Sequence, residues 1–257
     1  MISFMDATVE LRIAEDPSAL AEIAAQEVLE IARAAVAARG RFTVALAGGS
    51  TPRETYRRLA QAPLAAQMPW DRTVVFFGDE RGVPPNHPDS NYGMAHAALL
   101  SRVPIPPDRV FRIPGESADP DAVAAAYART LGEVLGVRRG ETPRLDLILL
   151  GLGVDGHTAS LFPGSPVLKE TFRIVAAVHA AAASIPQRFT LTYPILNAAA
   201  CVIYLVSGAE KAKVVKAALG DHSSGLPAAM VRPADGRLLW VLDRAAASLL
   251  PSSRRTS

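Results

Sequence analysis

Residues 42–54 read Phe-Thr-Val-Ala-Leu-Ala-Gly-Gly-Ser-Thr-Pro-Arg-Glu, and the fold follows from the transition that they contain. The apolar and β-branched residues 42–47 are typical of a buried strand, and the two glycines after them predict a tight turn. Thr51 can cap a helix that has Pro52 as its first residue and Glu54 as a capping-box partner. The stretch therefore predicts a strand, a turn and the start of a helix.

The same alternation continues on both sides of this stretch. Upstream, a short strand near residues 9–13 precedes a helix that opens with Asp16 and Pro17 and closes at Gly40. Further apolar runs predict strands at 73–77, 145–150, 173–178, 201–206 and 238–242, with helical stretches near 53–61, 91–101, 119–136 and 209–219. Strands that are apolar on both faces and alternate with helices predict an α/β protein with a mainly parallel sheet covered by helices on both faces.

Composition places the chain among compact globular proteins. It has 257 residues, of which 49% are hydrophobic and 20% are charged. We find no repeat, no low-complexity linker and no shift in composition, so we expect one domain over residues 1–257, with a flexible tail at 251–257 and surface loops at 138–144 and 220–228.

Charge and cysteine content narrow the class further. The chain has 27 Lys and Arg against 25 Asp and Glu, and Arg254 with Arg255 accounts for the excess, so a nucleic-acid partner is not expected. The single cysteine, Cys201, and the lack of zinc-ligand spacing favour a reducing compartment and no metal. The first residues lack the features of a signal peptide, and no apolar run is long enough to cross a membrane. We therefore predict a cytoplasmic protein without a membrane partner.

Three strand ends carry the residues of interest, because ligands of parallel sheets bind beyond the carboxyl ends of the strands. The first is the turn Gly48-Gly49-Ser50-Thr51, where backbone N–H groups and a helix N-terminus suit a phosphate. It is not a Walker loop, because no Gly-Lys-Ser/Thr follows. The alternative is a capped helix after a glycine turn with no ligand.

The second strand end reads Gly-Asp-Glu-Arg-Gly at residues 78–82. Asp79 and Glu80 could serve in acid/base chemistry or orient sugar hydroxyls, with Arg81 beside them. A solvated turn is the alternative for this segment. His87 and His96, further along, are expected to be loop and helix residues and not catalysts.

The third strand end reads Gly-Leu-Gly-Val-Asp-Gly-His-Thr-Ala-Ser at residues 151–160. Its glycines match the dinucleotide pattern G-x-G-x-x-G, but Pro163 and Pro166 exclude the long helix that this fingerprint requires. We expect the glycines to present Asp155 and His157 instead. A histidine in a polar loop after a buried strand is more often functional than one on an apolar helix face.

Two cations complete the candidate set. Lys211 follows the predicted strand 201–206 and could reach a phosphate from the first turns of a helix, whereas Lys213 and Lys216 also fit a solvated helix face. Arg188 opens another apolar stretch and is suited to bidentate binding of an anion.

Five ordered blocks of the chain resemble the 6-phosphogluconolactonase family, which belongs to a wider group that contains glucosamine-6-phosphate deaminases. The blocks are residues 46–52, 78–81 with 87–91, 153–163, Arg188 with its Thr-rich strand, and 208–211. The resemblance implies a Rossmann-like α/β fold and hydrolysis of 6-phosphogluconolactone to 6-phosphogluconate in the pentose phosphate pathway. It implies a small sugar-phosphate lactone as partner, with neither a metal nor an organic cofactor, and no feature indicates a protein partner.

Two departures separate the chain from the deaminases, which carry a tyrosine at the position of Arg81 and a catalytic glutamate at the position of Phe162. Phe162 can transfer no proton, and Arg81 would disfavour a protonated amino sugar. Both differences favour the lactonase over a deaminase. A non-catalytic sugar-phosphate sensor is a further alternative, because this kind of fold also serves as the effector domain of some transcription regulators. Such a sensor would need a DNA-binding module, and only one predicted helix precedes Gly48, which leaves no room for a helix-turn-helix.

Hydrolysis of a lactone needs a base for the attacking water and donors for the C1 oxyanion. We assign His157 as the general base, with Asp155 or Asp79 orienting it or a sugar hydroxyl. The backbone N–H groups of Gly48 and Gly49 or the side chain of Arg81 are candidate oxyanion donors. The phosphate is expected to lie between the turn at residues 48–51 and the cations Arg188 and Lys211. Ser160 lies in no G-x-S-x-G elbow, so no serine triad is expected.

Overall fold

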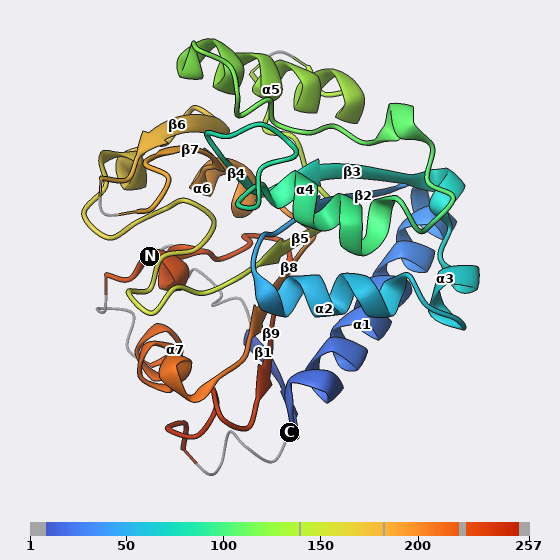
Figure 1. Cartoon of the computed structure of the whole chain (residues 1–257), viewed down its shortest axis with the longest axis vertical. Coiled ribbons are helices and arrows are strands. Elements are labelled where there is room, and N and C mark those ends of the chain that lie inside the picture. Colours follow the sequence, from blue (N-terminus) through green and yellow to red (C-terminus); the bar gives the residue numbers. More distant parts are fainter. Residues whose placement is uncertain (1–8, 139, 182, 221–224, 252–257) are drawn as a thin grey trace, which may run out of the picture.

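The computed structural model describes residues 9–138, 140–181, 183–220 and 225–251, and its main element is a six-stranded parallel sheet (Figure 1). The strands run in the order β1-β9-β8-β5-β2-β3. Their bounds are β1 (Val9–Ala14), β2 (Phe42–Leu46), β3 (Thr73–Phe77), β5 (Leu147–Leu150), β8 (Cys201–Val206) and β9 (Arg237–Asp243). The predicted mainly parallel α/β class is confirmed. All but the first residue of the predicted tail, and part of the predicted loop 220–228, lie outside the described residues.

A second, antiparallel sheet was not predicted. It has the order β4-β7-β6 and consists of β4 (Asp79–Arg81), β6 (Val175–His179) and β7 (Gln187–Leu191). The run at 173–178 does form a strand, but it does not join the parallel sheet. A parallel neighbour needs a crossover connection, usually a helix, whereas the segment between β5 and β6 holds only the 3₁₀ turn Pro166–Lys169.

Helices cover both faces of the parallel sheet. Their bounds are α1 (Pro17–Arg39), α2 (Ser50–Leu59), α3 (Leu64–Gln67), α4 (Asn91–Ala95), α5 (Pro120–Leu135), α6 (Tyr193–Leu196) and α7 (Ala212–Leu219). Figure 1 shows α1 and α7 on opposite sides of the sheet, and α5 beside β6, with which it packs. No helix of the described chain is long and apolar enough to cross a membrane.

The ends of α1 follow the predicted chemistry, and the start of α2 does not. Asp16 caps α1 by accepting a hydrogen bond from the Ala19 N–H at 2.8 Å, and Gly40 ends the helix with a positive φ of 73°. At α2 the predicted Thr51 cap is wrong: the helix starts at Ser50, Gly49 is its N-cap, and no side chain caps it. Glu54 instead pairs with Arg57 and Arg58 on the same helix, at 3.2 and 3.9 Å. The first N–H groups of α2 are therefore left without a side-chain acceptor.

The core lies on both faces of the central strands. Tyr204 of β8 and Trp240 of β9 are fully buried and stack with ring centroids 4.1 Å apart. Residues of both sheets belong to one apolar cluster, so the second sheet packs on the same core.

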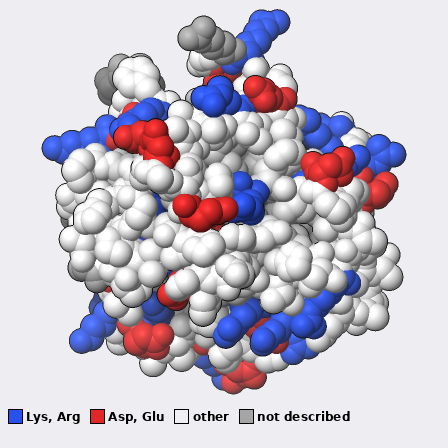
Figure 2. All heavy atoms as spheres, turned by 45° about the horizontal axis from the view of Figure 1, so that its top comes forward, with Lys and Arg blue, Asp and Glu red and all other residues white. Residues whose placement is uncertain are grey.

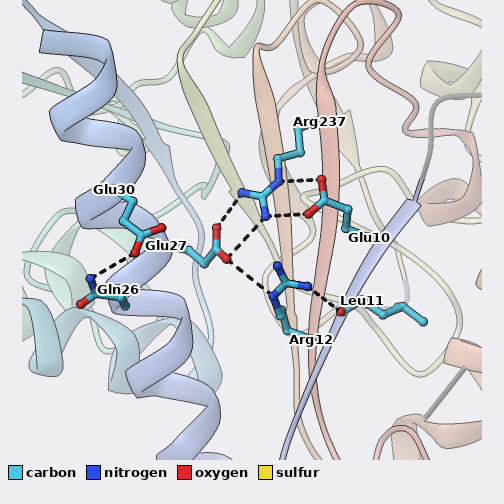
Figure 3. A network of polar contacts seen from close by, with 7 residues as sticks. All are labelled: Glu10, Leu11, Arg12, Gln26, Glu27, Glu30 and Arg237. Carbon is cyan, nitrogen blue, oxygen red and sulfur yellow. Dashed lines mark hydrogen bonds and ion pairs between the residues drawn. The ribbon is translucent and has the colours of Figure 1, made fainter. Parts of the chain in front are cut away.

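An ion-pair network ties the edge strand β1 to its neighbours (Figure 3). Arg237 of β9 donates to Glu10 of β1 at 2.7 Å and to Glu27 of α1 at 2.6 Å. The Nε of Arg12 lies 3.9 Å from the Oε1 of Glu27. The side chain of Glu27 is only 13% exposed, so this carboxylate depends on its arginine partners.

Charges of both signs lie side by side on the face seen in Figure 2, along its edges and as one acidic and one basic group near its centre. Such mixing cancels much of the long-range field over the residues described on this face.

Candidate active site

A cavity of about 320 Å³ opens at the carboxyl ends of four parallel strands. Its walls come from the segments that follow β2, β3, β5 and β8, which are neighbours or near neighbours in the sheet. The volume is in the range of small-molecule sites. The residues in its wall that bear on chemistry are Gly48, Gly49, Ser50, Thr51, Asp79, Arg81, His157, Ser207, Glu210 and Lys211.

His157 projects from the loop after β5 and is paired with Asp155. The His157 Nδ1 lies 2.6 Å from the Asp155 Oδ1, and the His157 N–H also donates to that oxygen at 3.2 Å. Burial acts to raise the pKa of Asp155, but the His157 N–H and ring outweigh it, so this pKa lies below its ordinary value. Asp155 is thus an ionised acceptor, which places the imidazole proton on Nδ1 and leaves the Nε2 lone pair free.

Two glycines of this loop occupy positions that favour glycine, one of them because of the close approach of His157. A Cβ on Gly153 would lie 2.0 Å from the His157 Nδ1, and Gly156 has a φ of +85° that suits glycine. No long helix follows, so the dinucleotide reading is excluded as predicted. The Phe162 ring packs against the imidazole, with centroids 4.6 Å apart.

Asp79 lies at the same cavity, but its carboxylate is held by other groups. Asn91 Nδ2 donates to its Oδ1 at 3.0 Å, and Ser160 Oγ donates to its Oδ2 at 2.8 Å. Asn91 also packs against the glycine turn, since a Cβ on Gly48 would lie 1.8 Å from the Asn91 Oδ1. Asp79 therefore joins three strand ends, those of β2, β3 and β5. No hydrogen bond between Asp79 and His157 is present within the described residues.

Glu80 has a structural role in this arrangement. It is 2% exposed and accepts hydrogen bonds from the N–H groups of Arg81, Asn91 and Tyr92 and from the Ser90 hydroxyl. Burial raises its pKa, although the three N–H groups oppose this effect. Glu80 thereby fixes the start of α4, from which Asn91 reaches Asp79.

The turn at residues 48–51 has the form expected of an anion site. Within the described chain, the N–H groups of Ser50 and Thr51, in the first turn of α2, have no hydrogen-bond acceptor. Free N–H groups at a helix N-terminus carry partial positive charge.

Arg81 and Arg188 lie directly opposite each other on the antiparallel pair β4–β7. Arg81 forms part of the cavity wall; its Nη1 donates to the Asp89 carbonyl at 2.6 Å, and its buried Nε has no partner among the described residues. Arg188 is 9% exposed and donates through Nε to the Ile185 carbonyl. Burial lowers the pKa of Arg188, and the charge of Arg81 lowers it further. Two adjacent guanidinium groups and one orphaned donor favour an anion at this place.

Lys211 contributes from the 3₁₀ turn Ala209–Lys211 after β8. The turn is anchored to β9, because Ser207 Oγ and the Gly208 N–H both donate to Asp243. Lys213 and Lys216 lie exposed on α7 and do not line the cavity, so they belong to a solvated helix face.

The structure thus brings together every predicted site residue at the cavity wall except Asp155, which contacts His157, and Arg188, which is paired with Arg81. Sequence reasoning missed the roles of Asn91, Ser160 and Ser207. Asn91 and Ser160 lie within the sequence motifs 87–91 and 153–163, but only the fold shows that both side chains donate hydrogen bonds to Asp79. Among the residues described, no group of three or more His, Cys, Asp or Glu could hold a metal ion.

Comparison with known proteins identifies close relatives of the chain. The family of glucosamine-6-phosphate isomerases/6-phosphogluconolactonase matches residues 15–240. The 6-phosphogluconolactonase of Nostoc sp. is 40% identical over 248 residues, which is 96% of this chain and 99% of the relative. That of Rattus norvegicus is 47% identical over 82% of each chain. The solved 6-phosphogluconolactonase from Trypanosoma cruzi has a TM-score of 0.86 at 32% identity, covering 97% of this chain and 99% of its own.

Proposed function

The chain belongs to the glucosamine-6-phosphate isomerase/6-phosphogluconolactonase family, and we propose that it hydrolyses 6-phospho-D-glucono-1,5-lactone to 6-phosphogluconate with His157 as the general base. The activity follows from relatives that carry this name at 40–47% identity. The observation that carries the mechanism is the pairing of Asp155 with the Nδ1 of His157 at the cavity. The proposed reaction is a step of the pentose phosphate pathway.

In the proposed reaction, the Nε2 of His157 takes a proton from a water molecule as the oxygen of that water attacks C1 of the lactone. The imidazolium that forms is stabilised by the ionised Asp155 across the 2.6 Å contact. Collapse of the tetrahedral intermediate breaks the bond from C1 to the ring oxygen, and that oxygen receives the proton. The product is a single open-chain molecule that carries the carboxylic acid at C1 and a free hydroxyl at the former ring oxygen.

The phosphate is bound by the turn before α2 and the turn after β8, which both line the cavity. The free N–H groups of Ser50 and Thr51 and the Lys211 side chain supply donors from two different strand ends. Arg81, supported by Arg188 across the β4–β7 pair, adds fixed positive charge. These contacts exist in the ground state and in the transition state, so they anchor C1 near His157 and affect mainly KM.

The C1 oxyanion needs a donor that is not already engaged. The orphaned Nε of Arg81 and the N–H groups of Gly48 and Gly49 are the candidates at this cavity. Asp79 accepts hydrogen bonds from Asn91 and Ser160 and none from the imidazole within the described residues. Each of its oxygens keeps a further acceptor site, so Asp79 is suited to bind a sugar hydroxyl rather than to orient His157.

Selectivity tests the assignment against a deaminase and against a non-catalytic sensor. Three compounds are compared: freshly prepared 6-phosphogluconolactone, unphosphorylated gluconolactone and glucosamine 6-phosphate. Acid release and ammonia release are followed, with spontaneous lactone hydrolysis subtracted. We expect efficient turnover of the phosphorylated lactone, poor turnover of gluconolactone and no ammonia, because Phe162 cannot carry a proton. Ammonia release, or equal kcat/KM on the two lactones, would overturn the proposal.

We further propose that the protein acts in the cytoplasm on this small-molecule substrate alone. The single cysteine supports a reducing compartment, since Cys201 lies buried in β8 and burial raises the pKa of its thiol to about 11. Such a thiol is poorly reactive.

A further inference from the structure

A second cavity, of about 630 Å³, lies next to the candidate active site and holds none of the groups assigned to the reaction. The two cavities share α2: Pro52 lies in the wall of the first and Arg53 in the wall of the second. The other walls come from residues 85–88, α4 and the turn after it. The residues of the second cavity that carry cationic or aromatic groups are Arg53, Arg57, His87, Tyr92, His96 and Arg102, and its lining residues include no carboxylate.

The positive charge of this second cavity is not neutralised by neighbouring carboxylates. Within the described chain, the guanidinium of Arg53 has no hydrogen bond or ion pair. Arg57 shares Glu54 with Arg58, at 3.2 and 3.9 Å. Asp89 is the other acidic side chain near the cavity, and it lies 3.8 Å from His87. Glu54 is shared by Arg57 and Arg58, and Asp89 lies beside His87, so the three guanidinium groups of the cavity keep an excess of donors for an anion.

The backbone holds one of these arginines in place by an uncommon device. Residues His96–Leu100 form a π-helical turn, a conformation that is rare and is frequently found at functional sites. Arg102 Nε donates at 2.8 Å to the carbonyl of Ala97, which belongs to this turn and to the cavity wall. That bond orients Arg102 and leaves its two terminal nitrogens available.

We propose that the second cavity binds a phosphorylated anion, distinct from the substrate, between Arg53 and Arg102. Planar guanidinium groups bind phosphate oxygens in pairs, and the volume of the cavity suits a small metabolite. The anion would connect the first turns of α2 with the segment that carries the π turn. The same α2 begins at the phosphate turn of the active site, so the two sites are adjacent but chemically separate.

Calorimetric titration with inorganic pyrophosphate at constant ionic strength tests this assignment. The variants are Arg53→Ala/Arg102→Ala, Lys211→Ala, and Arg129→Ala as a matched control on an exposed face of α5. We expect two binding events in the unmodified protein. The double variant should raise the Kd of one event by at least about 10-fold while lactone turnover without pyrophosphate stays unchanged. Lys211→Ala should weaken the other event, and Arg129→Ala neither.

The proposal is overturned if pyrophosphate does not bind, or if the double variant binds it as the Arg129→Ala control does. A single event in the unmodified protein is assigned by the variant that removes it. Its loss in the double variant supports the second cavity, and its loss in Lys211→Ala alone rejects it. Unchanged lactone turnover in the double variant shows that the chain is folded.

Discussion

At the scale of single residues, the proposed mechanism depends on the contact between His157 and Asp155. His157→Asn should lower kcat by roughly 100-fold or more, as expected for loss of a general base, with little change in product binding. The measurement is the rate of acid release after subtraction of spontaneous hydrolysis, with His179→Asn on the exposed end of β6 as control. A nearly normal kcat would remove His157 from the mechanism and direct attention to Asp79.

Lys211 and Arg81 line the cavity, whereas Arg188 does not. Lys211→Ala should raise KM by about 10- to 100-fold, because it removes a charged hydrogen bond to the phosphate. Arg81→Ala should raise KM as well, and it should also lower kcat if the unpartnered Nε of Arg81 donates to the C1 oxyanion. Arg188→Ala should raise KM less, since Arg188 reaches the site only alongside Arg81. Steady-state kinetics on the phosphorylated lactone measure all three. A large fall in kcat for Arg188→Ala at constant KM would instead place this arginine at the lactone carbonyl.

At the scale of elements, the site depends on how separate strand ends are joined. Asn91→Ala should remove both a donor to Asp79 and the contact under Gly48, so we expect kcat to fall by about 10-fold and thermal stability to fall as well. Ser160→Ala removes one donor to the same carboxylate and should have a smaller effect of the same kind. Asn86→Ala, exposed in the loop before α4, is the control. Equal kinetics in all three variants would show that the position of Asp79 does not matter.

The edge strand β1 offers a comparison between two ion pairs. Arg237→Gln should lower the free energy of unfolding by about 1–3 kcal/mol, because it leaves the largely buried Glu27 with only a distant partner. Arg244→Gln breaks an exposed pair with Glu15 and should cost about 1 kcal/mol or less. Urea unfolding of both variants measures the difference. A larger loss for Arg244→Gln would contradict this account of Figure 3.

Local sequence patterns predicted most of these elements but not all their partners. The strand at 42–46 and the caps Asp16 and Gly40 depend on short-range chemistry, so they were predicted correctly. The Thr-Pro-x-Glu pattern fits a capping box and predicts Thr51 as the cap of α2, yet the helix begins two residues earlier, with Gly49 as its N-cap. The antiparallel β4–β7 pair depends on residues more than 100 positions apart, for which a single sequence carries no local signal.

At the scale of the whole molecule, the parallel sheet explains why the candidate site could be predicted at all. Strands β2, β5 and β8 are neighbours, so the segments after them must meet at one edge, and β3 adds Asp79 and Arg81 beside them. What the topology rule does not supply is side-chain pairing. Whether Asp155 or Asp79 contacts the imidazole is decided by a turn of three residues at 155–157, and the structure places Asp155 there.

The whole molecule should also lose stability in acid, and Glu170 is the residue that tests this. The Glu170 carboxylate accepts hydrogen bonds from the N–H groups of Arg173 and Phe172 and from the side chain of Arg173. These hydrogen bonds lower the pKa of Glu170 from 4.5 to about 2. An acid whose pKa is lowered on folding stabilises the fold in its ionised form. Its contribution is complete above about pH 4.5 and is lost as the pH falls toward 2. Glu80 acts in the opposite sense, because burial raises its pKa.

Glu170→Gln should therefore lower the free energy of unfolding near neutral pH and leave it nearly unchanged at about pH 2, where the native carboxyl is half protonated and most of its advantage is gone. Urea unfolding of both proteins over this pH range measures the gap. Glu141→Gln, on an exposed surface loop, is the control and should leave the difference constant with pH. If the gap between Glu170→Gln and the unmodified protein stayed the same from neutral pH to acid, the carboxylate would not be the group that holds this turn, and the N–H contacts would be equally satisfied by an amide oxygen.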